Sequence, residues 1–164
     1  MDRVHLRGAA VLFGASSVVF LLDRVTKLWA ERALADAPVD LVPGVLTLRF
    51  TTNSGGAFSL GQSAPWVFAG ASIAVSAAIA ATAFRHRDRT VSVALGLVLG
   101  GALGNLADRA FRGPGLSGRV VDFVDLHLWP IFNLADAAIV VGALLLAWSS
   151  ARAGGRGKEP VHDG

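Results

Sequence analysis

The sequence predicts an all-α membrane protein with four transmembrane helices and a small extracytoplasmic β-sheet or hairpin between helices 1 and 2. Hydrophobic residues make up 53% of the 164 residues and charged residues only 16%, and the mean hydropathy is +0.55. This composition leaves too little polar surface for a protein in water. The hydrophobic residues form four runs, and each run reaches, with its flanks, the roughly 20 residues that cross a bilayer core. The runs are residues 8–22, 66–84, 91–107 and 133–150.

Basic residues beside these runs predict the orientation. They cluster in the N-terminal segment, in the connection at 85–89 and in the tail, and such clusters favour the cytoplasmic side. We therefore expect both termini in the cytoplasm, a single domain over residues 1–152 and a flexible tail over residues 153–164. The net charge of +3 is not arranged in one stripe, so no nucleic-acid partner is expected.

One alternative for the first run is a cleavable signal peptide, because the small residues at 33–35 resemble a cleavage site. Charged residues separate that site from the apolar run, which argues against cleavage. We therefore treat the first run as a membrane helix.

Two outer segments connect the helices. Residues 39–60 are rich in β-branched and aromatic residues and contain Pro43 and Gly44, a pattern typical of a hairpin or small sheet. Residues 109–132 contain a cluster of turn residues and are expected to form an extracytoplasmic loop. The third run carries a small-residue stripe that permits close helix packing, formed by Gly96, Gly100 and Gly104.

Polar residues gather at the outer ends of the third and fourth runs. Asn105, Asp108 and Arg109 share a helix face by their spacing, and we expect Asp108 and Arg109 to form a structural ion pair. Asn133 and Asp136 repeat the spacing in the fourth run. A carboxylate in a membrane segment is a functional candidate by default, but the N-terminus of a helix also favours an acid. Position alone leaves both interpretations of Asp136 open.

A further carboxylate makes the functional interpretation stronger. Asp122 lies in the apolar stretch VVDFV, which would hold it against the membrane surface near Asp136. Two carboxylates in a partly apolar site cannot both ionise cheaply, so they share a proton. In an aspartyl protease the ionised acid draws a proton from water while the protonated acid polarises the scissile carbonyl. Asp122 and Asp136 are therefore the candidate catalytic pair, and this chemistry needs no metal or cofactor.

The sequence contains fewer of the residues that other catalytic mechanisms need. The chain has no Cys, which excludes a thiolate nucleophile. Only His127 and Lys27 are expected on the outer side as partners for a nucleophilic Ser. A metal site formed by Asp122, Asp125 and His127, as in a metal-dependent lipid head-group transferase, is the main enzymatic alternative. A small proton-coupled transporter is the non-enzymatic alternative.

Four motifs resemble the lipoprotein signal peptidases, or signal peptidase II. They are NSGGAFS, GGALGNLADR, VVDFVD and FNLADAAIVVG, in that order along the chain. The resemblance extends from LLDRVTK at 21–27 to the end of the fourth run. It implies a bacterial inner-membrane aspartyl endopeptidase that removes the signal peptide from diacylglyceryl-modified prolipoproteins, cutting just before the lipidated Cys.

The resemblance also implies roles for individual residues. Asp122 and Asp136 correspond to the catalytic aspartates of the family, at the extracytoplasmic face of the membrane. The expected partners are the lipidated precursor and membrane lipids, and we expect a monomer. Residues implied to bind substrate are Asn53, Gly55, Asn105, Arg109 and Asn133, and those implied to give structural support are Asp23, Lys27 and Asp108.

Overall fold

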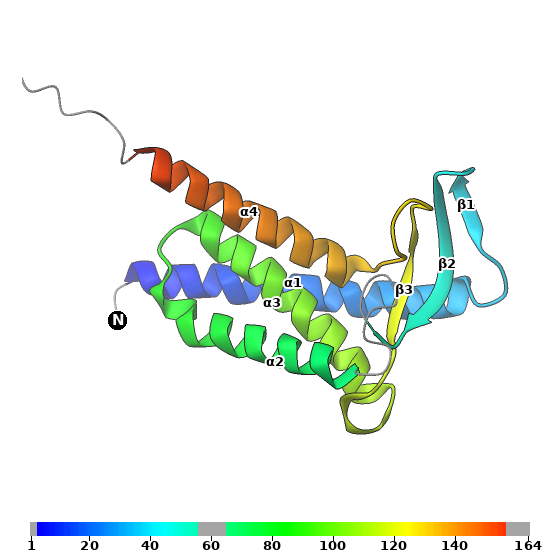
Figure 1. The fold of residues 1–164 in the computed structure, drawn as a ribbon. Coiled ribbons are helices and arrows are strands. Elements are labelled where there is room, and N and C mark those ends of the chain that lie inside the picture. Colours follow the sequence, from blue (N-terminus) through cyan, green and yellow to red (C-terminus); the bar gives the residue numbers. More distant parts are fainter. Residues whose placement is uncertain (1–2, 56–64, 157–164) are drawn as a thin grey trace, which may run out of the picture.

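The computed structural model describes residues 3–55 and 65–156 and contains four long helices and a small sheet (Figure 1). The sheet lies at one end of the helices, and the N-terminus and the end of α4 lie at the other. All four helices are long and apolar enough to cross a membrane, as predicted. The helices are α1 (Arg3–Ala33), α2 (Pro65–Thr82), α3 (Arg89–Phe111) and α4 (Leu134–Arg156), and the 3₁₀ turns are η2 (Ala83–Arg85) and η3 (Pro114–Leu116).

Helix α1 is longer than the apolar run that predicted it. It contains 31 residues and continues through charged residues beyond Leu22. Asp23 and Lys27 lie one helical turn apart, form an ion pair at 2.9 Å and are fully buried. Because these charges neutralise each other against α3, the helix extends past the point where its hydrophobic sequence ends. Cleavage of α1 as a signal peptide near residue 35 would remove both of these buried residues from the protein.

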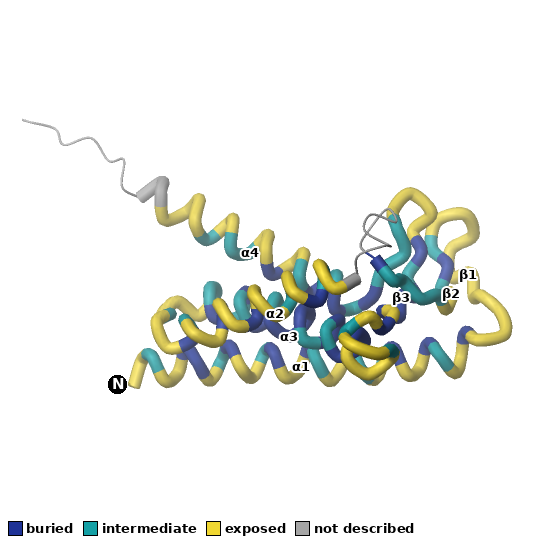
Figure 2. Tube along the Cα trace, turned by 60° about the horizontal axis from the view of Figure 1, so that its bottom comes forward, coloured by how far each residue is buried: buried dark blue, intermediate teal, exposed yellow. Residues whose placement is uncertain are grey.

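Helix α3 is the centre of the bundle, because it packs against α1 and α4 and, less extensively, against α2. Figure 2 shows buried residues along α3 and an exposed outer part of α4. A Cβ atom added to Gly96 would lie 2.5 Å from the carbonyl oxygen of Leu12, and one added to Gly100 would lie 2.6 Å from that of Ser16. The small-residue stripe is thus a packing surface within the chain, in contact with α1.

The sheet has three antiparallel strands in the order β1 (Val39–Val42), β2 (Leu46–Asn53) and β3 (Val120–Asp125). The first two form the predicted hairpin, whose expected residues 56–60 lie outside the described part. The prediction of a loop throughout 109–132 was wrong, because β3 comes from this segment. Five of its six residues are buried, so it lacks the alternation that identifies a strand with one face in water.

A turn after β3 brings the chain back to the bundle. Val124 and Phe132 form an isolated antiparallel bridge, with hydrogen bonds in both directions between their backbones. His127 adopts a positive φ of 60° within this turn. As a result, α4 begins at Leu134, directly beside β3.

Candidate active site

Helix α4 begins with a capping box. Asn133 Oδ1 accepts a hydrogen bond from the Asp136 N–H at 2.9 Å, and Asp136 Oδ2 accepts one from the Asn133 N–H at 3.3 Å. This reciprocal arrangement satisfies two free N–H groups of the first helical turn. It also fixes the Asp136 side chain, whose Oδ1 accepts a second side-chain hydrogen bond, at 2.7 Å, from Nδ2 of Asn105.

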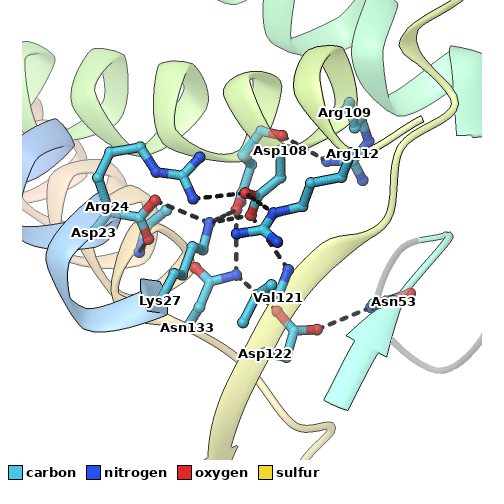
Figure 3. A network of polar contacts seen from close by, with 12 residues as sticks. Asp23, Arg24, Lys27, Asn53, Asp108, Arg109, Arg112, Val121, Asp122 and Asn133 are labelled. Carbon is cyan, nitrogen blue, oxygen red and sulfur yellow. Dashed lines mark hydrogen bonds and ion pairs between the residues drawn. The ribbon is translucent and has the colours of Figure 1, made fainter. Parts of the chain in front are cut away.

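The second carboxylate, Asp122, is held by strand β3 and is only 3% exposed. Its Oδ1 accepts a hydrogen bond from Asn133 Nδ2 at 2.7 Å, and its Oδ2 accepts one from Asn53 Nδ2 at 3.2 Å (Figure 3). Asn53 is the last residue of β2, and its partner in the sheet is Val120. Asn133 therefore contacts both carboxylates, and the sheet register brings Asn53 to the same place.

The surroundings of Asp122 favour its protonated form. The pKa of Asp122 is raised to about 7, first by burial and then by the negative charge of Asp136, while hydrogen bonds from Asn133 and Asn53 act in the opposite direction. No ion pair among the described residues includes Asp122 or Asp136. The two acids can therefore share a proton near neutral pH.

Both carboxylates line a cavity of about 380 Å³ between α2, α3, α4 and β3. Its polar end is formed by the two aspartates, by Asn53 and Asn105, and by Arg109. The rest of the wall is largely apolar and comes from α2, α4 and the turn before α4, including Phe68, Ala71, Ile131, Phe132, Ile139 and Val140. A peptide bond near the acids and apolar groups beside α2 and α4 would each meet a matching environment.

Arg109 belongs to this cavity and not to an ion pair with Asp108, so that prediction was wrong. Consecutive helical residues point about 100° apart, and Asp108 faces α1 while Arg109 faces the cavity. Arg109 Nη2 donates to the Gly55 carbonyl oxygen at 3.2 Å, and its guanidinium lies 5.7 Å from the centre of the Phe68 ring. Its Nε is buried and has no hydrogen-bond partner among the described residues. Phe68 was not predicted as a site residue, because nothing in its apolar helix distinguishes it.

Asp108 belongs to a separate α1–α3 charged cluster, which consists of Asp23, Arg24, Lys27, Asp108 and Arg112 (Figure 3). Lys27 Nζ lies 2.9 Å from Oδ2 of both Asp23 and Asp108. Arg24 and Arg112 each approach Asp108 Oδ1 to 2.7 Å. The spacing of four residues between Asp108 and Arg112 is a sequence signal for this pairing, whereas the pairing with Arg24 requires the contact between α1 and α3.

The charged cluster also supports β3. The Val121 N–H donates to Asp108 Oδ2 at 3.2 Å, and Val121 directly precedes Asp122. The Ala135 N–H donates to Asp23 Oδ1 at 3.2 Å, and Ala135 directly precedes Asp136. Each candidate catalytic acid thus follows a residue whose backbone is bound to the cluster.

The residues of the metal alternative do not converge. Asp125 pairs with Arg49 at 2.7 Å, and the His127 ring contacts Thr47 Oγ1 at 2.9 Å. Asp122 contacts Asn53 and Asn133 instead. Within residues 3–55 and 65–156, no group of three or more His, Cys, Asp or Glu side chains is arranged to hold a metal ion.

Comparison with known proteins identifies the family. The family model described as "Signal peptidase (SPase) II" matches residues 15–152. The chain belongs to the signal peptidase II family. The lipoprotein signal peptidase of Rhodococcus jostii is 41% identical over 138 residues, which cover 83% of this chain and 70% of that protein. The lipoprotein signal peptidase of Pelotomaculum thermopropionicum is 40% identical over 141 residues, covering 84% of this chain and 90% of that protein.

A solved structure of a bacterial membrane enzyme has the same fold. A bacterial membrane enzyme determined by the in meso method matches with a TM-score of 0.78 and 25% sequence identity, over 91% of this chain and 92% of that one. The predicted activity, an aspartic peptidase for lipoprotein processing in a multi-pass membrane fold, is confirmed by the family. The transferase and transporter alternatives are set aside for the same reason.

Proposed function

We propose that Asp122 and Asp136 are the catalytic dyad of this lipoprotein signal peptidase. We further propose that the enzyme cleaves diacylglyceryl-modified prolipoproteins just before the lipidated Cys. One observation carries the proposal: carboxylates from β3 and α4 face the same cavity, share Asn133 as a hydrogen-bond partner and have no cation paired with them among the described residues.

The chemistry follows from one proton shared by two acids. Asp136 carries the negative charge and acts as the base that takes a proton from water. The water oxygen attacks the scissile carbonyl carbon while the protonated Asp122 donates to the carbonyl oxygen. When the C–N bond breaks, the proton taken by Asp136 passes to the leaving amine of the Cys. Asp122 regains its proton as the new carboxyl group forms, so no covalent intermediate is needed.

The remaining polar residues of the cavity have complementary roles in this proposal. Asn53, Asn105 and Asn133 orient the carboxylates, as their hydrogen bonds indicate. Arg109 binds a backbone carbonyl of the substrate, since its buried Nε–H has no partner within residues 3–55 and 65–156 and is costly to bury unless a ligand accepts from it. Gly55 holds Arg109 through its carbonyl oxygen.

The placement in the membrane follows from the charges and the cavity. The basic N-terminal segment and the end of α4 lie at the end opposite the sheet (Figure 1), which favours a cytoplasmic position for both termini. The site then faces the extracytoplasmic interface, where the signal helix of a precursor ends. The apolar wall from α2 and α4 suits the signal helix and the acyl chains. One chain supplies the whole dyad and its amides, which supports a functional monomer.

A gel-shift cleavage assay with the purified full chain tests the proposal. The substrates are a precursor lipoprotein with and without its diacylglyceryl group. We expect only the lipidated precursor to be cut, and Asp122→Asn or Asp136→Asn to lower kcat by about 10³-fold or more, because acid and base catalysis are lost. EDTA should leave the rate unchanged.

Asp125→Asn is the matched control, because Asp125 lies on the same strand but pairs with Arg49. This variant should retain activity within a few-fold of the wild type. Substantial turnover by either dyad variant would remove Asp122 and Asp136 from the mechanism. Loss of activity in EDTA, restored by a divalent ion, would instead support a metal site.

A further inference from the structure

Lys27 makes a contact that charge neutralisation does not explain. Its side chain is fully buried in α1 and lies 2.9 Å from each of two carboxylates, Asp23 and Asp108. Two acids are sufficient to neutralise one ammonium. The third contact of Lys27 Nζ, at 3.0 Å, is to Oδ1 of Asn105, which points from the charged cluster toward the dyad.

Asn105 connects the ammonium to the dyad. Its Oδ1 accepts hydrogen bonds from Lys27 Nζ and from Asn133 Nδ2, and its Nδ2 donates to Asp136 Oδ1 at 2.7 Å. A flipped Asn105 amide would place its NH₂ group against two donors and its oxygen against a carboxylate. Because an ammonium has only donors, Lys27 excludes the flipped orientation.

We propose that Lys27 is a positioning residue of the dyad, which acts through Asn105 to hold and polarise the amide N–H that binds Asp136. This inference rests on the proposed function, since it assigns Lys27 a role in the proton chemistry of Asp122 and Asp136. A hydrogen-bonded chain that starts at a charged donor strengthens its later bonds, so the Lys27 charge strengthens the hydrogen bond that Asn105 donates to Asp136.

The electrostatics of the site support this role. The pKa of Asp122 is raised by burial and by Asp136, and the positive charge of Lys27 acts against this rise. Loss of Lys27 should therefore raise the pKa of Asp122 further. The charged and titratable groups that face the pair are Asp23 and Lys27 from α1, Asp108 and Arg109 from α3, Asp122 from β3 and Asp136 from α4.

The test compares two variants of the charged cluster in the full chain, with the lipidated precursor as substrate. Asp23→Asn/Lys27→Met removes the hydrogen bond to Asn105 without leaving a new unpaired charge, because Met has no N–H donor and a neutral pair replaces an ion pair. We expect kcat to fall about tenfold or more, the energy scale of a hydrogen bond to a charged group. KM should change less than about twofold, and the bell-shaped pH profile should shift upward by about half a unit.

Arg24→Gln is the matched control. Arg24 is a cation of the same helix and contacts the same Asp108, but it does not reach Asn105. This variant should lower the thermal midpoint while kcat and the pH profile stay close to wild type. A folded double variant with wild-type kcat and pH profile overturns the inference, and so does an Arg24→Gln profile that shifts as much as that of the double variant.

Asn105→Ala tests the same link if the double variant does not fold. Lys27 keeps both of its carboxylates in this variant, so the charged cluster remains neutralised. We expect a similar loss of kcat with a lower thermal midpoint, because buried donors lose their acceptor, and a wild-type kcat overturns the inference. If Asp122→Asn and Asp136→Asn are inactive while the Lys27 and Asn105 variants behave as wild type, only this inference fails. If the two dyad variants are active, the proposed function fails as well.

Discussion

Two carboxylates of this protein come from the same local sequence and have opposite environments. Asn-Leu-Ala-Asp occurs at residues 105–108 and again at 133–136. Asp108 is fully buried and lies within 2.9 Å of Lys27, Arg24 and Arg112. Asp136 faces the cavity and, among the described residues, binds only amide and backbone N–H groups. An acid neutralised by three cations stays ionised and inert, whereas an acid held by neutral donors remains available for proton transfer.

The position of each acid in its helix explains this difference. Asp108 lies in the last turn of α3, where the helix dipole and the free carbonyl groups disfavour a negative charge. The cations of the charged cluster offset this cost. Asp136 lies in the first turn of α4, where the free N–H groups favour a carboxylate without any cation. The same four residues therefore form a structural site at one helix end and a candidate catalytic site at the other.

The largest expected effect is a difference in unfolding free energy between Asp108→Asn and Asp136→Asn. Asp108→Asn leaves the buried Lys27 with Asp23 alone and removes the carboxylate shared by the partly exposed Arg24 and Arg112. This change should cost about 3–5 kcal/mol of unfolding free energy. Asp136→Asn removes no ion pair and should change stability by less than about 1 kcal/mol, although it removes activity. Thermal unfolding of both variants in one detergent checks this difference. Equal destabilisation of the two variants would break the comparison.

The next effect concerns the pH dependence of stability. Because the pKa of Asp122 is raised to about 7, the folded protein holds a proton that an unfolded Asp loses near pH 4. Stability is therefore lost as the pH rises from about 4 through 7. Asp122→Asn avoids this loss and should be more stable than the wild type near pH 8, by up to ~4 kcal/mol.

This advantage of Asp122→Asn should disappear below about pH 3, where the wild-type acid is neutral in both states. Thermal midpoints measured at several pH values and one scan rate provide the test, because membrane proteins often unfold irreversibly. Asp125→Asn serves as the control, since Asp125 is held by Arg49. A constant difference between Asp122→Asn and the wild type at all pH values would contradict the raised pKa.

The smallest effect tests the helix contact that assembles the charged cluster. Gly100→Ala places a methyl group 2.6 Å from the Ser16 carbonyl oxygen, so α1 must move away from α3, at a cost of about 1–3 kcal/mol. Gly70→Ala on α2 meets no atom within 4 Å and should be neutral. A lower thermal midpoint for Gly100→Ala alone would show that the stability of the fold depends on this close approach of α1 and α3, and equal midpoints would contradict it.

Much of the fold could be predicted because its signals are local. The four spans follow from hydropathy, and the β1–β2 hairpin follows from its turn residues and β-branched flanks. Strand β3 was missed because it is buried on both faces. The extension of α1 beyond Leu22 was missed because a hydropathy average counts Asp23 and Lys27 as two polar residues. In the structure they form one neutral, buried ion pair.

The sequence by itself determined which residues are present at the outer ends of the helices and indicated the family through its motifs. Only the tertiary structure decided how these residues are used. Arg109 was expected to neutralise Asp108, yet Arg24, 84 residues away in sequence, does so with Lys27 and Arg112. The physical reason is that the state of a buried carboxylate depends on the charges and donors within a few ångströms, and here many of them come from parts of the chain distant in sequence, such as Lys27 and Arg24 for Asp108, Asn53 for Asp122 and Asn105 for Asp136.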